Sequence, residues 1–292
     1  MKRRGQIRES LEGLWKHRSG LVGSLLLIGY LLLAIFGPLI APQDPYAQDL
    51  SLSLRPGFWS HEYVPPYFLG TDLHGRDILS RILYGARVTI GMGIVSVLVS
   101  TCLGLILGIL GGYHGGLIDQ CLMLINDVMM SFPTILLAII FIAVFGPGLD
   151  KALIAVAFVF TPRIVRVARS ATLGIRELDY ILAARAAGVS TVMIQIRHIF
   201  PNLLAPVMVQ ATFSMSQAIT TIAGLGFLGL GAQPPSPEWG AMLSDALRYL
   251  LSRIWWYPFF PGLMITGIVL GFNMTGDGLR DALDPKLRRI RQ

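Results

Sequence analysis

Charged residues are scarce in this sequence of 292 residues. Asp, Glu, Lys and Arg together make up 14% of the chain, whereas a soluble globular domain has about 25%. Hydrophobic residues make up 53%, and the mean hydropathy is +0.62. The few charges gather in short clusters that are separated by long uncharged runs. This pattern excludes an ordinary soluble domain and predicts an all-α membrane protein.

The sequence motifs of common enzymes are also absent. No Gly-Lys pair occurs, which excludes the phosphate loop G-x-x-x-x-G-K-[ST], and neither G-x-S-x-G nor H-E-x-x-H is found. The five histidines are scattered, and the two cysteines, Cys102 and Cys121, lie in apolar runs without metal-ligand spacing. We therefore predict no catalytic residue, no metal site and no cofactor in this chain, which is not expected to be an enzyme.

Six runs of low charge are candidates for membrane spans. A span needs about 20 mainly apolar residues, and only the fourth run, of eleven residues or about 17 Å of helix, is clearly short. The first run is too long for the apolar region of a signal peptide, and Pro42 follows the only plausible small-residue cleavage site, so we predict an uncleaved helix. The runs are residues 19–43, 88–113, 117–149, 152–162, 199–237 and 254–276.

The distribution of basic residues supports the short fourth span. The formal net charge of +7 is compatible with nucleic-acid binding, but in a membrane protein it more often marks cytoplasmic loops. With six transmembrane helices and both termini in the cytoplasm, seventeen of the 24 Lys and Arg residues lie inside and seven outside. Without the fourth span, the basic cluster at 163–197 falls outside and the bias disappears. We therefore predict six spans and no nucleic-acid partner.

The long loop after the first span contains a helical pattern. From Asp77 onward, apolar residues recur at positions 78, 79, 82 and 83, which is typical of an amphipathic helix before the second span. Three interpretations remain open for this extracytoplasmic segment, residues 44–87: a lid, a docking surface, or a helix that lies at the membrane interface.

Charged residues near the third and fourth spans are candidates for the solute pathway or for an interface. Arg163, Arg166 and Arg169 are three residues apart and form a stripe that drifts about 60° per step. We expect this stripe to be buried against neighbouring helices or the central pathway near the cytoplasmic side. The alternative interpretation is that these side chains extend to lipid headgroups. Asp127 is the best candidate for a buried ionisable group, with a structural or interfacial role favoured by its position.

The cytoplasmic loop at residues 170–200 is unusually long and contains a second helical pattern. Residues 179–187 are rich in alanine, which favours helix and leaves a smooth surface for close approach. Gly188 permits the left-handed turn that ends a helix. An amphipathic stretch follows up to Pro201, where we expect the fifth span to begin. The loop is either a docking segment for a partner or a surface helix on lipid headgroups.

These residues resemble a known family. The loop is similar to the EAA loop of binding-protein-dependent ABC importer permeases, with Ala183, Ala184 and Gly188 at matching positions and Pro201 closing it. Segments 69–81, 226–240 and 276–287 resemble the second permease subunit of the dipeptide/oligopeptide/nickel group. The resemblance covers essentially the whole chain and implies the transmembrane fold of a type I ABC importer.

The resemblance implies a domain organisation and a set of ATPase-coupling residues. Residues 1–18 and 277–292 are expected to be cytoplasmic ends, 19–43 the first transmembrane helix, 44–87 the extracytoplasmic loop, and 88–276 the core permease domain. The family's loop glutamate is replaced by Leu182, so an ionic contact is either lost or made elsewhere, for which Arg185 is a candidate. The expected coupling residues are Tyr180, Leu182, Ala183, Ala184, Arg185, Ala187 and Gly188.

The resemblance also implies a multi-subunit importer in the inner membrane of a bacterium or an archaeon. The expected partners are a homologous permease, two cytoplasmic ATPases that bind ATP and Mg²⁺, an extracytoplasmic solute-binding protein, and membrane lipid. Peptides are the favoured cargo, with nickel complexes and glutathione-like solutes as alternatives in the same group. A secondary transporter is the main alternative from another class, but it would be expected to show buried ionisable residues or a broken-helix repeat.

Overall fold

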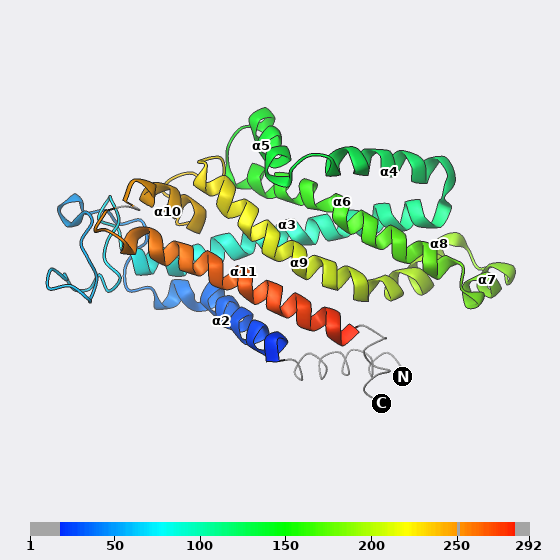
Figure 1. Cartoon of the computed structure of the whole chain (residues 1–292), viewed down its shortest axis with the longest axis horizontal. Helices are drawn as coiled ribbons and strands as arrows, with labels where there is room; N and C mark the ends of the chain where they lie inside the picture. Colours follow the sequence, from blue (N-terminus) through cyan, green and yellow to red (C-terminus); the bar gives the residue numbers. More distant parts are fainter. Residues whose placement is uncertain (1–17, 250–251, 284–292) are drawn as a thin grey trace.

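The computed structural model describes residues 18–249 and 252–283, which form an elongated bundle of helices (Figure 1). Within these residues the only β-type pairing is an isolated bridge between Thr71 and Asp77. Most of the predicted cytoplasmic N-terminal segment, and residues 284–292 of the predicted tail, lie outside the described residues. The helices are α2 (Arg18–Ile40), α3 (Ile78–His114), α4 (Gly116–Met130), α5 (Thr134–Phe145), α6 (Leu149–Arg176), α7 (Asp179–Ala186), α8 (Thr191–Ile194), α9 (Phe200–Phe227), α10 (Trp239–Ala246) and α11 (Trp256–Leu283), with short turns η1 (Leu50–Leu52), η2 (Gln195–Ile199) and η3 (Leu247–Tyr249).

Four helical stretches among the described residues are long and apolar enough to cross a membrane: Ser19–Ile40, Ile78–His114, Thr191–Phe227 and Trp256–Ala282. The pair α4 and α5 adds a fifth candidate, although it is bent by 96°. Helix α6 has 28 residues, or about 42 Å, and runs alongside α3 and α9 (Figure 1). It is long enough to span but too charged to be recognised by its composition, so the six-span count depends on including it.

The bend between α4 and α5 was not expected from the sequence, which predicted a single continuous helix for the third span. Met130 ends α4 and Thr134 begins α5. Pro133 between them has no N–H to donate to a helix and restricts the residue before it. Since the residues around the bend, 131–133, are exposed, no neighbouring helix holds the chain straight.

Helices α3 and α6 form the most extensive helix–helix contact among the described residues. A Cβ atom on Gly104 would lie 2.5 Å from Cβ of Ile164, and one on Gly108 would lie 2.6 Å from Cβ of Ala168. These two glycines lie one turn apart on α3, and because they have no side chain the backbones of α3 and α6 can approach closely. At one end of this pair a second core cluster gathers α3, α6, α7 and α9, separate from the larger first cluster; it comprises Leu105, Ile164, Ala168, Ile181, Ile194, Ile199, Leu203 and Val207.

The amphipathic pattern at residues 78–83 is the first part of α3 rather than a separate helix. Asp77 caps it, because its carboxylate accepts a hydrogen bond from the backbone N–H of Ser80 at 2.8 Å. Burial raises the pKa of this carboxyl group. Ile78 and Ile82 are buried in the first core cluster. The amphipathic segment is therefore not a separate helix that lies at the membrane interface, since its apolar face packs inside the protein. The lid and the docking surface stay predictions for the rest of the loop.

The fifth span likewise does not begin at Pro201. The helix runs continuously from Thr191 to Phe227, and the five residues Gln195–Ile199 form a π-helical turn. Proline at position 201 removes one i→i−4 hydrogen bond and its ring crowds the carbonyl one turn earlier, which accounts for a widened turn at this point. The amphipathic return segment and the span are thus a single element.

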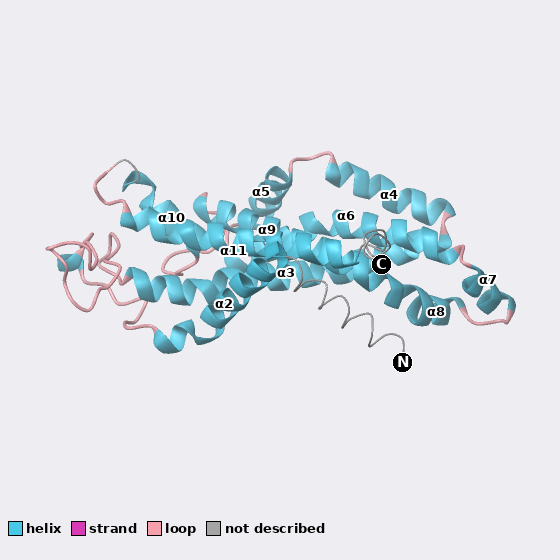
Figure 2. Ribbon diagram, turned by 60° about the horizontal axis from the view of Figure 1, so that its bottom comes forward, coloured by secondary structure: helices cyan, strands magenta, loops and turns pink. Residues whose placement is uncertain are grey.

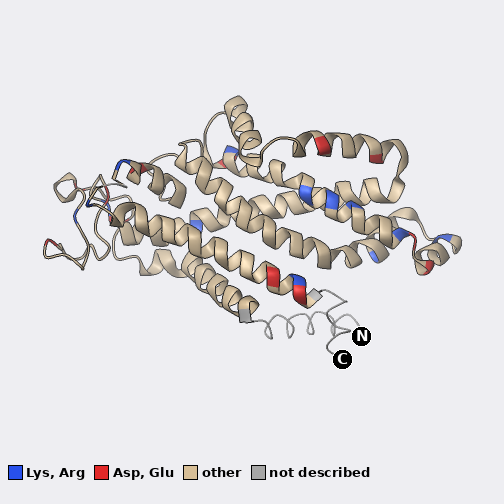
Figure 3. Cartoon of the chain, viewed as in Figure 1, with Lys and Arg blue, Asp and Glu red and all other residues tan. Residues whose placement is uncertain are grey.

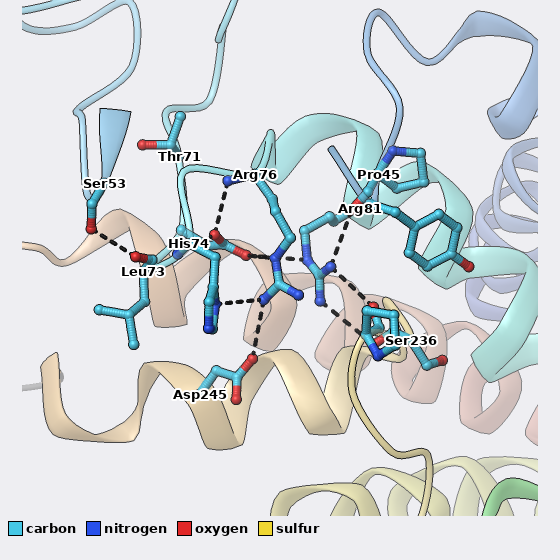
Figure 4. Close-up of polar contacts among 12 residues, drawn as sticks. Pro45, Ser53, Thr71, Leu73, His74, Arg76, Arg81, Ser236 and Asp245 are labelled. Atoms are coloured by element: carbon cyan, nitrogen blue, oxygen red, sulfur yellow. Dashed lines mark hydrogen bonds and ion pairs between the residues drawn. The ribbon is translucent and has the colours of Figure 1, made fainter. Parts of the chain in front are cut away.

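A buried ionic network holds the 41–77 loop against the helices (Figure 4). The Asp72 carboxylate accepts a hydrogen bond from Arg76 Nε at 2.6 Å and lies 3.5 Å from Arg81 Nε. Arg76 also reaches Asp245 near the end of α10 at 3.5 Å, while Arg81 donates to the carbonyl oxygens of Pro45 and Pro235, both at 3.2 Å. Because Asp72 and both guanidinium groups are almost fully buried, the network fixes the loop rather than displaying charge.

Candidate functional site

Helix α7 lies at one end of the elongated bundle, and the 41–77 loop lies at the other end (Figures 1 and 2). One apolar side chain, Ile181, anchors α7: it is fully buried in the second core cluster. Ile194 and Ile199 from the return segment belong to the same cluster. The helix predicted within residues 179–188 therefore exists, and its own return segment braces it.

The outward face of α7 carries mainly small side chains. Ala184, however, is half-buried and packs against the second core cluster, so this predicted docking residue faces inward. The exposed members of the predicted coupling loop are Tyr180, Leu182, Ala183, Arg185, Ala187 and Gly188. A partner that approaches α7 thus meets a flat surface flanked by one aromatic, one aliphatic and one cationic side chain.

Gly188 ends α7 in the left-handed conformation, as the sequence predicts, with φ of +77°. Its N–H donates to the carbonyl oxygen of Arg185 at 3.0 Å, and the N–H of Val189 donates to the carbonyl oxygen of Ala184 at 3.1 Å. These bonds satisfy carbonyl groups at the helix end that have no partner within the helix. Gly188 therefore sets the direction in which the chain leaves α7.

Two arginines connect α6 and α7 to the last turn of α3. The guanidinium of Arg185 lies over the ring of Tyr113, 5.5 Å from its centroid. Arg176 at the end of α6 donates to the carbonyl oxygen of Gly112 at 2.8 Å and pairs with Glu177 at 2.8 Å. Arg185 therefore contacts Tyr113 within the chain, while Leu182 remains exposed.

The charged residues of the third and fourth spans meet as pairs between α4 and α6, where charged residues stand along otherwise uncharged helices (Figure 3). Arg169 binds both oxygens of Asp119, and Arg166 Nη2 lies 2.7 Å from Asp127 Oδ1. Arg163 donates to the Thr134 hydroxyl at 3.2 Å and lies over the Phe160 ring at 5.3 Å. The expected burial of the arginine stripe holds only in part, because Arg166 is 55% exposed.

Sequence reasoning missed several polar residues of the bundle. It did not identify Asp119 as the partner of Arg169, and it did not single out Gln217 and Thr220, which are exposed on α9. They precede Gly224 by about two turns and one turn, on the helix face that meets Ile135 of α5. An uncharged glutamine in the middle of a span was the available signal. Beside the bend between α4 and α5, the polar contact that the structure gives is the one from Arg163 of α6 to Thr134.

Two family models match the chain. Residues 104–289 match the binding-protein-dependent transport system inner membrane component, and residues 5–66 match the N-terminal transmembrane domain of oligopeptide transport permease C. The first match covers more than half of the chain and includes the whole of α4 to α10. The second match includes all of α2.

Curated relatives are similar over nearly the full length. The dipeptide transport system permease protein DppC of Escherichia coli (strain K12) is 46% identical over 274 residues, which cover 94% of this chain and 91% of the relative. The protein of the same name from Alkalihalophilus pseudofirmus is 44% identical over 281 residues, which cover 96% and 90%. At these identities, the chain and its relatives share a fold and a family over nearly their whole length.

A solved structure shows the same fold at low sequence identity. A chain of the MetNI methionine ABC transporter in an inward-facing conformation aligns with a TM-score of 0.54 and 21% identity, over 70% of this chain and 96% of that chain. This neighbour supports the type I importer fold alone. The chain belongs to the family of binding-protein-dependent transport system inner membrane components, as an ABC importer permease of the dipeptide/oligopeptide group.

Proposed function

We propose that this chain forms half of the translocation pathway of an ATP-driven importer for short peptides. The observation that carries the proposal is the similarity, over more than 90% of the chain, to relatives whose names specify peptides. One of these is the di/tripeptide transport system permease protein DppC of Pseudomonas aeruginosa, at 44% identity over 273 residues. Nickel complexes and glutathione-like solutes are the alternatives within the same group.

The proposed partners are a homologous permease subunit, two ATPase subunits and an extracytoplasmic solute-binding protein. Helix α7 supports the ATPase contact, because it projects at one end of the bundle and exposes small side chains beside Leu182. ATP and Mg²⁺ would then bind the partner ATPases. The alternative of a surface helix on headgroups is less consistent with a face that is mostly alanine and glycine, because these side chains provide little apolar area to bury in lipid.

The proposed orientation places α7 and both termini in the cytoplasm and the 41–77 loop outside, in agreement with the distribution of basic residues. Ser51 in this loop and Ser190 after α7 are both exposed. After replacement of Cys102 and Cys121, single cysteines at these two positions are labelled with an impermeant thiol reagent on intact cells. Labelling at position 51 alone supports the orientation, whereas labelling at position 190 refutes it.

Transport in a strain that lacks its own peptide permeases tests the cargo. The chain is expressed with its partner subunits, and uptake of a labelled dipeptide is compared with uptake of nickel and of glutathione. Leu39→Trp is the control, because Leu39 of α2 is exposed and far from α7 in sequence. Peptide uptake that is lost with Ala183→Trp but retained with Leu39→Trp supports both the cargo and the coupling role. Import of nickel or glutathione without dipeptide refutes the peptide assignment, and uptake without any ATPase subunit indicates a secondary transporter.

A further inference from the structure

The ion pair between Arg166 and Asp127 is exposed, although it lies along the length of the bundle and not at the α7 end. The side chains are 55% and 62% accessible. Arg166 is ten residues from the end of α6, and Asp127 is eleven residues from the start of α4, so each lies about 15 Å along its helix from the α7 end. Charges at such depth are costly in lipid and normally face water or protein. This face of α4 and α6 therefore borders an aqueous pathway or another polar surface.

The three arginines of α6 differ in how completely they are paired. Arg169 donates two hydrogen bonds to Asp119. Arg166 donates one hydrogen bond to Asp127, and Arg163 donates one to the Thr134 hydroxyl. Among the residues that the structure describes, no carboxylate forms an ion pair with Arg163. Because a guanidinium has five N–H donors, Arg163 and Arg166 both keep donors that these two hydrogen bonds do not use. The positive charge of Arg163 is not balanced by a carboxylate among the described residues.

We propose that Arg163 and Arg166 together bind the C-terminal carboxylate of the cargo peptide during its passage through the permease. This inference rests on the proposed peptide function. The two residues are three positions apart on α6 and therefore neighbours on one helix face. Their planar forks match the geometry of a carboxylate, which they bind with charge-assisted hydrogen bonds.

The chemistry of this site suits a permease that accepts many peptides. Every unmodified linear peptide carries the terminal carboxylate, whatever its side chains, so a site that reads this group is independent of the peptide sequence. Asp127 already holds Arg166 through one oxygen atom, so the incoming carboxylate exchanges for a similar group. Partial exposure of the arginines to solvent keeps the interaction weak, which allows release on the far side.

The test compares Arg163→Gln, Arg166→Gln and the double variant in the complete transporter, reconstituted in proteoliposomes with its binding protein. Arg87→Gln is the matched control, because Arg87 is an exposed arginine on α3 outside this face. Two quantities are measured: dialanine uptake per ATP hydrolysed, and ATPase stimulation by loaded binding protein. We expect uptake per ATP to fall about tenfold in the double variant, with stimulation unchanged, since α7 and the 41–77 loop are intact.

A second measurement tests whether the C-terminal carboxylate of the peptide is the group that is bound. Saturation-transfer NMR on the detergent-purified complex, without binding protein, compares dialanine with dialanine amide. The wild type and Arg87→Gln should favour the free carboxylate, and the double variant should show no preference. Equal signals for both peptides in the wild type, or unchanged uptake per ATP in the double variant, would overturn the inference while peptide import stands.

Two other outcomes also count against the inference. Loss of the homologous permease from the purified double variant would assign the arginines to the subunit interface instead of the cargo. Absence of any dialanine uptake by the wild type, with import of another solute, would overturn the proposed peptide function and this inference with it.

Discussion

Gly188 offers the sharpest test of the coupling segment, because its effect is confined to the backbone. Its φ of +77° is strained for most residues with a side chain, above all β-branched ones, yet a Cβ atom at this position would meet no atom within 4 Å. Gly188→Val therefore introduces no clash inside the chain and acts only through the left-handed conformation. Asparagine tolerates that conformation, so Gly188→Asn is the matched control of similar size.

The expected magnitude follows from the conformation alone. A β-branched residue in the left-handed region costs about 1–2 kcal/mol, which lowers the population of the native exit from α7 by a factor of about 5–30. The hydrogen bonds from Gly188 and Val189 to the carbonyl groups at the helix end weaken together. The bundle itself should stay folded, because Ile181 and Ile194 remain buried in the second core cluster.

The assay is ATP hydrolysis by the purified complex, with and without loaded binding protein. We expect Gly188→Val to lose most of the stimulation or to co-purify with less ATPase subunit, while Gly188→Asn stays close to the wild type. Normal stimulation in the valine variant would refute a role for the left-handed turn. An equal loss in both variants would show that side-chain volume at a docking surface matters instead, which contradicts the backbone argument.

The remaining predictions concern packing, charge and pH. Ala183→Trp should weaken ATPase co-purification without changing the thermal midpoint, whereas Ala184→Trp should lower the midpoint because Ala184 packs inward; identical behaviour would contradict the assignment of faces. Asp72→Asn should leave two buried guanidinium groups without their shared carboxylate and destabilise the 41–77 loop by about 3–5 kcal/mol, seen as faster limited proteolysis there; an unchanged rate would refute the buried network. Burial raises the pKa of Glu238 although backbone N–H groups donate to it, so its stabilisation is greatest when protonated and is lost as pH rises through the raised pKa. Glu238→Gln should therefore gain thermal stability relative to the wild type as the pH rises above the ordinary glutamate pKa of about 4.3, and a difference that is constant or falls with pH would contradict this.

Features that depend on local sequence were predicted correctly. Uncharged runs predicted the apolar spans, because a helix must satisfy its own backbone in lipid and must be apolar over its length. The helix at 179–188 and its left-handed end at Gly188 follow from alanine propensity and from the conformational freedom of glycine. Each of these depends on a few consecutive residues, so no knowledge of distant neighbours was needed.

Features that depend on where a helix stops were predicted less well. The pattern beginning at residue 78 and the return segment before Pro201 were each taken as separate from the next span, but both are continuous with it. Pro133 bends the chain by 96°, whereas Pro201 only widens a turn. Proline weakens a helix at both places, and the neighbouring helices determine whether the chain continues.

The sequence by itself determined the class of this protein, its apolar spans and the position of α7, the predicted coupling helix, since hydrophobicity, charge bias and helix propensity act over short stretches. Only the tertiary structure decided that Ala184 faces inward, that Asp72 lies between two buried arginines, and that Arg163 has no carboxylate partner within residues 18–249 and 252–283. These outcomes depend on atoms separated by tens of residues along the chain. Burial and ion pairing are properties of the packed bundle, and no local pattern encodes which charge is left free.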